Sequence, residues 1–121
     1  MRGLTVILVS TEPAKARAAL TIALGAAAIG QRSRVFAHER AVALLTADPQ
    51  ADPADAELAR SGLPNLPSLL AMTAEAGVEL WACQTGLAIT GLTIADMAPA
   101  TQAGGLIALM TTLGDDRLLT V

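Results

Sequence analysis

The chain has 121 residues, a formal net charge of −3, and 53% hydrophobic against 16% charged residues. This length suits one compact domain over residues 1–121. So few charges, against roughly 25% in an average soluble domain, predict a homo-oligomer that covers part of its apolar surface. The chain has no basic run and almost no aromatic residues for base stacking, which argues against nucleic acid as a direct ligand.

Cysteine and histidine each occur once in the sequence. An internal disulfide and a Cys/His metal cluster are therefore not available, and we predict no metal and no other cofactor. The apolar run at residues 4–9 is too short for the core of a signal peptide. The uncharged residues 98–114 contain Gly, Pro, Gln and Thr, unlike a membrane span of about 20 apolar residues. These features predict a cytoplasmic protein without a membrane segment.

The first half of the chain alternates between strand and helix patterns. Residues 4–9 (LTVILV) are rich in β-branched residues and predict a buried strand that ends in the loop STEP. Residues 13–29 are dominated by Ala and Leu and begin with a proline suited to a first helical turn, which predicts a helix. A second strand at 33–39 and a short helix at 39–46 follow.

The second half begins with a polar crossover. Residues 47–66 carry three of the six prolines and a cluster of Asp, which predicts a loop with one helical turn at 54–60 and the least ordered segment of the chain. The remaining predicted elements are a helix at 67–76, a third strand at 78–83, helical turns at 85–90, a short fourth strand around 99–102, a helix at 105–113 and a fifth strand at 116–121.

This alternation predicts an α/β fold, namely a single three-layer α/β/α domain with a five-stranded, mostly parallel, flavodoxin-like sheet. If the strands follow the common order 2-1-3-4-5, strands one and three are neighbours. The ligand-binding switch point then lies between their carboxyl ends. The segments STEP (10–13) and CQTG (83–86) would face each other across that crevice.

Cys83 is the main candidate for chemistry, because it stands at the end of the third strand and just before a helical turn. The unpaired amides at the start of that turn favour a thiolate, and a nucleophilic sulfur in a small neutral pocket suits the transfer of sulfur through a persulfide. A structural interpretation competes evenly with this one, because free cysteine often behaves as a buried hydrophobe. The residues placed to hold the substrate, by hydrogen bonds or by close backbone approach to an anion, are Ser10, Thr11, Gln84, Thr85, Gly86, Gly104 and Gly105.

Other kinds of cysteine chemistry fit this sequence less well. A thioredoxin-type dithiol needs a second cysteine, and a phosphatase-type loop needs an arginine where this chain has Ile89. A typical peroxiredoxin site carries Thr or Ser where this chain has Leu80. A rhodanese-type loop would end in a basic residue, and none lies near Cys83 in the sequence.

Two larger side chains have a structural and a functional interpretation. Trp81 shares a strand face with Cys83, so it either walls the pocket or packs in the core. His38 ends the second strand, which is one strand removed from the third in the assumed order. This placement favours an ordinary surface histidine over a base or hydrogen-bond partner of the cysteine.

The glycine pair and the acidic cluster are equally open to two interpretations. Gly104 and Gly105 either cradle an anion at a helix start or allow tight packing of a helix on the sheet. Asp48, Asp52 and Asp55 have the residue type of a metal triplet, but their loop composition predicts solvated charge instead.

The residues GVELWACQTGLAITGL (77–92), followed by DMAPATQAGGLIALM (96–110), resemble the DsrE/DsrF-like family. The resemblance spans nearly the whole chain. Its most specific parts are the strand-end cysteine preceded by GVELWA and the double glycine that opens the last helix. The resemblance implies a small α/β sulfur-relay protein in a trimeric or hexameric assembly. It also implies that Cys83 carries persulfide sulfur between a donor and an acceptor protein.

Two functions remain open from the sequence. The first is a small cytoplasmic sulfur carrier, or sulfurtransferase-like protein, in which Cys83 accepts and passes on persulfide sulfur. The second is a non-catalytic homo-oligomeric binding module in which Cys83 only packs. That module would hold a small anion or a nucleotide-like ligand at the switch point between strands one and three.

Overall fold

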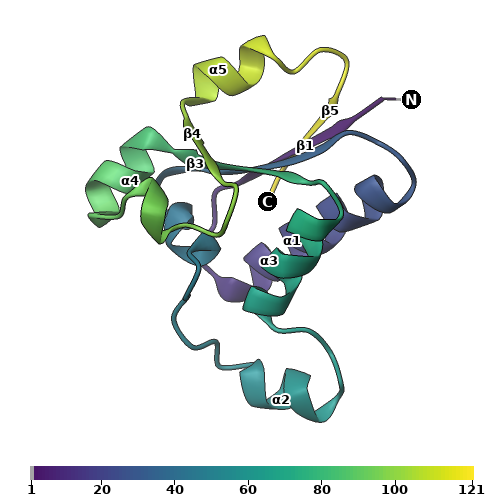
Figure 1. Cartoon of the computed structure of the whole chain (residues 1–121), viewed down its shortest axis with the longest axis vertical. Helices are drawn as coiled ribbons and strands as arrows, with labels where there is room; N and C mark the ends of the chain where they lie inside the picture. Colours follow the sequence, from purple (N-terminus) through teal and green to yellow (C-terminus); the bar gives the residue numbers. More distant parts are fainter. Residues whose placement is uncertain (1) are drawn as a thin grey trace.

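The computed structural model, which describes residues 2–121, contains the expected alternation of strands and helices (Figure 1). The elements in chain order are β1 (Leu4–Leu8), α1 (Pro13–Ala28), β2 (Ser33–Ala37), the 3-10 helix η1 (Glu39–Leu45), α2 (Asp55–Arg60), α3 (Leu66–Glu75), β3 (Glu79–Cys83), α4 (Gln84–Thr90), the 3-10 helix η2 (Ile94–Asp96), β4 (Gln102–Gly104), α5 (Leu106–Thr111) and β5 (Arg117–Thr120). Each predicted element is present, and η2 is an addition that the sequence patterns did not predict.

The fourth strand begins later than predicted. The sequence pattern placed it around 99–102, whereas β4 covers Gln102–Gly104. The preceding residues form a turn closed by a hydrogen bond from the Thr101 amide to the Ala98 carbonyl at 3.2 Å, with Ala100 in the left-handed region at φ 66°. An extended strand cannot start inside this turn, so pairing with β3 begins only at Gln102.

All neighbouring strands of the sheet are parallel, in the order β4-β3-β2-β1-β5. The chain therefore steps from each strand to its neighbour between β1 and β4 and then returns to the far side of β1. The assumed order 2-1-3-4-5 is wrong, because β2 lies between β1 and β3. The order reverses between β1 and β5, so the predicted crevice between strands one and three is not formed.

Helices cover both faces of the sheet. The Ser33 hydroxyl donates a hydrogen bond to the Ala23 carbonyl of α1 at 2.7 Å, whereas Arg34 Nη1 donates to Thr112 Oγ1, just after α5, at 2.8 Å. Consecutive strand residues point to opposite faces, so α1 and α5 lie on opposite sides of the sheet. Figure 1 shows α1 and α3 on one side and α5 on the other, which confirms the three-layer α/β/α fold.

Small residues let α1 lie close to the sheet. Ala16, Ala19, Leu20 and Ala23 recur at intervals of three or four and are all buried, so they form one face of the helix. α3 packs beside α1 on the same side of the sheet. Every residue of β1 and β2 is buried, because both faces of these central strands are covered.

The polar crossover between η1 and α3 is tied to α1 by an acidic residue. Asp52 forms an ion pair with Arg17, accepts a hydrogen bond from the Ala54 amide at 2.9 Å, and is 7% exposed. Its own amide donates to Asp55 Oδ2 at 3.0 Å. The prediction of solvated loop charge is therefore wrong for Asp52, because this carboxylate finds a cationic partner on the neighbouring helix. Asp48 is exposed as predicted.

A buried arginine lies under α5. Arg34 is 1% exposed, and its Nε donates a hydrogen bond to Thr5 Oγ1 at 3.0 Å. Its guanidinium carbon lies 5.9 Å from the ring centroid of Trp81, which is cation–π range. Burial lowers the pKa of Arg34, and the neighbouring Arg32 lowers it further, while the negative charge of Asp116 opposes the shift.

Asp116 is the anion of this cluster. It accepts hydrogen bonds from Thr5 Oγ1 at 2.9 Å and from Arg32 Nη2 at 2.8 Å, and Arg34 Nη2 lies 3.8 Å away. Burial by itself raises the pKa of Asp116, but the hydrogen bonds from Arg32 and Thr5 and both arginine charges outweigh it. The pKa therefore lies below its ordinary value. The cluster joins β1, β2 and the segment between α5 and β5.

Candidate functional site

Cys83 is the last residue of β3 and flanks the first turn of α4. Its backbone is extended, with φ −62° and ψ 127°, and α4 begins at the next residue. The predicted position at the carboxyl end of the third strand is confirmed. Cys83 is a free and largely buried cysteine, with 6% of the residue exposed.

The side chains of Cys83 and Trp81 point to the α5 side of the sheet. Successive side chains of a strand point to opposite faces, so Ala82, between them, points to the other side. Cys83 is in register with Gly104 on β4. A Cβ atom at Gly104 would lie 2.7 Å from Cζ3 of Trp81, so the absence of a side chain makes room for the indole ring. The Trp81 ring is partly buried and packs against Gly104 and the hydrophobic core, as the structural interpretation predicted.

The contacts of the glycine pair favour tight packing over an anion cradle. Gly104 packs against the Trp81 ring, whereas a Cβ atom at Gly105 would meet no other atom within 4 Å among the described residues. Gly105 is the residue before α5, a helix of six residues. Of the pair, only Gly104 is held in place by a close neighbour.

Gly86 allows a close backbone contact, but the contact is within the protein. A Cβ atom at this position would overlap the carbonyl oxygen of Glu39, the first residue of η1, and would lie 2.9 Å from Cγ1 of Val42. The expectation that Gly86 admits a bound anion is therefore replaced by a packing role. The contact fixes the start of α4 against the chain that leaves β2.

Of the four remaining predicted substrate-binding residues, two lie next to Cys83 and two do not. Ser10 and Thr11 follow β1, and β2 separates them from β3. The Ser10 hydroxyl accepts a hydrogen bond from the Glu12 amide at 3.0 Å, which organises the loop before α1. Gln84 and Thr85 are exposed on the first turn of α4, next to Cys83. The prediction of a site between strands one and three is thus wrong. Ser10 and Thr11 follow β1, Cys83 ends β3, and β2 lies between these two strands.

His38 is the neighbour of Cys83 that the sequence analysis placed too far away. It follows β2 directly, and β2 is hydrogen-bonded to β3. Its backbone is extended, with φ −95° and ψ 135°, and its ring centroid lies 6.2 Å from that of Phe36. The sequence does carry a signal for this placement, because both residues end a strand of the same parallel sheet, but the assumed strand order hid it.

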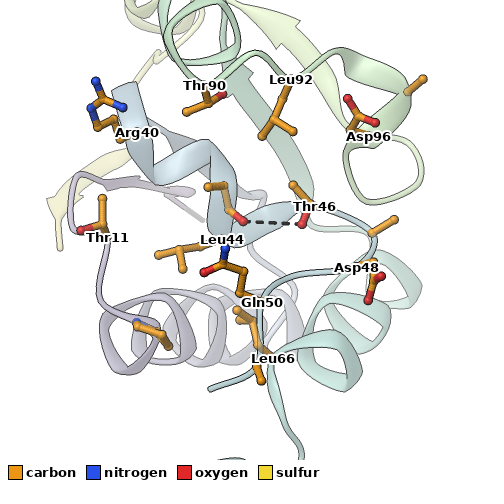
Figure 2. A pocket seen from close by; sticks show the side chains of 15 residues that line it. Thr11, Arg40, Leu44, Thr46, Asp48, Gln50, Leu66, Thr90, Leu92 and Asp96 are labelled. Atoms are coloured by element: carbon orange, nitrogen blue, oxygen red, sulfur yellow. Dashed lines mark hydrogen bonds between the residues drawn. The ribbon is translucent and has the colours of Figure 1, made fainter. Parts of the chain in front are cut away.

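A separate cavity of about 850 Å³ lies between η1, the crossover loop and the segment after α4 (Figure 2). Arg40 and Thr11 lie on one side of it, and Asp48 and Asp96 lie on the other. Cys83 does not line this cavity. Its lining residues are Thr11, Pro13, Arg40, Ala43, Leu44, Thr46, Ala47, Asp48, Gln50, Ala51, Leu66, Thr90, Leu92, Ala95 and Asp96.

Two kinds of site are absent from the described part of the chain. Within residues 2–121, no three His, Cys, Asp or Glu side chains come together where they would hold a metal ion. None of the helices in this described part of the chain is long and apolar enough to cross a membrane.

Comparison with known proteins relates the sequence to one family and the fold to two solved structures. The DsrE/DsrF-like family profile matches residues 4–121. The fold is similar to the crystal structure of the ychN protein from E. coli, with a TM-score of 0.69 and 20% identity. It is also similar to the protein of unknown function MTH1491 from Methanobacterium thermoautotrophicum, with a TM-score of 0.70 and 13% identity. Both comparisons cover 100% of each chain. No curated protein is significantly similar in sequence.

Proposed function

The chain belongs to the DsrE/DsrF-like family, and on that premise we propose that it is a small cytoplasmic sulfur carrier or sulfurtransferase-like protein in which Cys83 accepts and passes on persulfide sulfur. The family is associated with sulfur relay. The observation that carries the proposal is the position of the one cysteine at the carboxyl end of β3, directly before α4. In this proposal residues 1–121 act as a single domain.

The chemistry needs one nucleophilic thiol and no cofactor. The Cys83 thiolate attacks the outer sulfur of a donor persulfide R–S–SH, a new S–S bond forms on Cys83, and the old S–S bond breaks to release R–S⁻, which takes up a proton. The sum is Cys83–SH plus R–S–SH giving Cys83–S–SH plus R–SH, so no oxidant is consumed. A second thiol, on an acceptor protein, removes the sulfur by the same exchange.

The surroundings of Cys83 suit this step. The first amides of α4 point toward the carboxyl end of β3 and favour negative charge there. The Trp81 ring packs against Gly104, the residue of β4 that is in register with Cys83. Because only 6% of Cys83 is exposed, donor and acceptor must reach the sulfur at the strand end, next to the exposed Gln84 and Thr85.

Sulfur uptake by Cys83 is the direct test. After incubation with glutathione persulfide, the intact wild-type chain is expected to gain the mass of one sulfur atom, and a thiol reductant is expected to remove it. The Cys83→Ser variant keeps the size of the side chain and is expected to gain nothing. An unchanged wild-type mass, or the same gain in both proteins, would contradict the proposal. A gain of one whole glutathione would indicate attack on the inner sulfur instead.

The cavity beside η1 favours a second candidate function, a homo-oligomeric binding module for a small anion or a nucleotide-like ligand. Its volume of about 850 Å³ suits a small molecule, and Arg40 offers a cation at one side. The ligand site of this candidate lies beside η1 rather than between strands one and three. In both candidates we propose assembly as a trimer or hexamer, because the edge strand β5 leaves Leu118 and Leu119 exposed at 46% and 37%.

The second candidate predicts that Arg40 contributes to ligand affinity and that the protein in solution has the mass of an oligomer. Calorimetric titration with inorganic phosphate and with a nucleotide is expected to show binding that weakens about tenfold or more in Arg40→Ala. Arg60→Ala, on the exposed surface of α2, is the matched control and is expected to bind as the wild type does. Sedimentation equilibrium is expected to give a multiple of the chain mass. Absence of binding, or equal loss in the two variants, would refute the binding role, and a monomer would refute the assembly.

A further inference from the structure

His38 and Cys83 lie side by side on one face of the sheet. Ala37 of β2 and Ala82 of β3 are register partners in neighbouring parallel strands. His38 and Cys83 are the next residues, and both have extended backbones. Their side chains therefore point away from those of the alanines, toward the same face. Adjacent strands are about 4.8 Å apart, so the two residues are neighbours across the strand pair, and in this structure no hydrogen bond joins Nδ1 of His38 to the thiol.

Backbone hydrogen bonds fix His38 between β1 and η1. The His38 amide donates a hydrogen bond to the Leu8 carbonyl at 2.9 Å, and its carbonyl accepts one from the Ala41 amide at 3.0 Å. One residue further along, Glu39 packs against Gly86 at the start of α4. The segment with the imidazole and the segment with the thiol are thus anchored to each other on both sides of the pair.

The imidazole has an unused polar atom. Nδ1 of His38 is buried and has no hydrogen-bond partner among residues 2–121. A neutral imidazole nitrogen without a proton is an acceptor, and a buried acceptor that lacks a donor costs free energy. The neighbouring side chain that carries a transferable proton on this face is Cys83, whose thiol is a weak donor.

We propose that His38 accepts the proton of the Cys83 thiol and returns it to the thiolate that leaves the sulfur donor. This inference deepens the proposed sulfur-carrier function and rests on it. In the first step the S–H bond of Cys83 breaks, its proton moves to the imidazole, and the electron pair stays on sulfur. The thiolate then attacks the donor, and the imidazolium gives its proton to the departing R–S⁻. The overall exchange neither gains nor loses a proton.

Other charges lie too far away or too exposed to take this role. Arg34 and Glu79 share the sheet face, but Arg34 stands four residues before His38 and Glu79 four residues before Cys83, about 13 Å along each strand. The remaining charged groups of the adjoining elements are the exposed Glu39 and Arg40 of η1 and the exposed Glu12 after β1.

The test measures the pH at which the Cys83 thiol becomes a thiolate. Thiolate absorbance in the ultraviolet is followed from about pH 5 to about pH 10 for the wild type and for His38→Gln, with Cys83→Ser subtracted as the baseline. Because the proposal hands the proton of the thiol to the imidazole, the midpoint is expected to move to more alkaline pH in His38→Gln. A residue that only packs would leave the midpoint in place. Superimposable curves would overturn the proposal.

Folding and function are read separately. Thermal unfolding and circular dichroism test whether His38→Gln is folded. If it is not, His38→Asn takes its place in the experiment, because the amide nitrogen of asparagine occupies the position of Nδ1. Sulfur uptake from glutathione persulfide near neutral pH is expected to slow about tenfold in the variant. Equal uptake in both proteins would overturn the role of His38 alone. A shifted thiolate midpoint with no sulfur uptake in any protein would overturn the sulfur-carrier function and keep the proton transfer.

Discussion

Replacing Asp116 by alanine is expected to lower the free energy of unfolding by about 3–5 kcal/mol. The Asp116 side chain is 4% exposed and is the anion that faces the buried Arg34 and the guanidinium of Arg32. Without it, the positive charge of Arg34 stays in the interior next to a second positive charge, and the Thr5 hydroxyl loses its acceptor. The penalty is that of a buried cation without a counter-charge, which exceeds the gain from an ordinary hydrogen bond.

Chemical denaturation of matched variants measures this effect. Asp115→Ala removes the neighbouring carboxylate, which is exposed, and only the backbone carbonyl of that residue accepts a hydrogen bond, from Arg2. This control is expected to stay within about 0.5 kcal/mol of the wild type. Equal stabilities of Asp115→Ala and Asp116→Ala would contradict the cluster as a source of stability.

The same carboxylate gives the stability a pH dependence. Since the pKa of Asp116 is lower in the folded chain than in the unfolded one, its contribution is fully present above the unfolded value of about 3.9. It is lost as the pH falls below that value and through the lower pKa of the folded protein. The stability difference between the wild type and Asp116→Asn is therefore expected to shrink on acidification below about pH 4. A constant difference down to strongly acidic pH would contradict this assignment.

The elements of this fold follow from local patterns, whereas the buried cluster does not. Residues 4–9 and 13–29 predict β1 and α1 because β-branched runs and Ala-rich amphipathic segments have few alternatives. Arg34 sits inside SRVFA, a segment that predicts a strand but gives no reason to bury a guanidinium. Its partners come from two distant parts of the chain, Thr5 from β1 and both Thr112 and Asp116 from the segment between α5 and β5. Only the tertiary structure brings them together.

The candidate site was predictable in part for the same reason. The strand-end position of Cys83 depends on local patterns and is confirmed. Its neighbours depend on the strand order. The three central strands are all short and largely buried segments, and their local patterns do not distinguish β4-β3-β2-β1-β5 from the commoner order. This one global choice removes Ser10 and Thr11 from the site and brings in His38.

Replacing Gly86 by alanine is expected to destabilise the fold by about 1–3 kcal/mol and to disturb the site. The new methyl group would overlap the Glu39 carbonyl, which is backbone and has no rotamer by which to escape. Either η1 or the start of α4 must shift. Because Cys83 precedes α4 and His38 precedes Glu39, any such shift separates the imidazole from the thiol.

Gly25→Ala is the matched control for this substitution. Gly25 lies in α1, and a Cβ atom there would meet nothing within 4 Å among the described residues. Alanine is expected to raise the free energy of unfolding by about 0.5–1 kcal/mol at this position, since it favours helix more than glycine does. Denaturant unfolding is expected to show a lower free energy of unfolding for Gly86→Ala and a higher one for Gly25→Ala. Equal changes in the two variants would contradict the close contact at Gly86. At a temperature where Gly86→Ala is still folded, its sulfur uptake from glutathione persulfide is expected to be slower than that of Gly25→Ala. The contact with Glu39 then positions the pair as well as stabilising the fold.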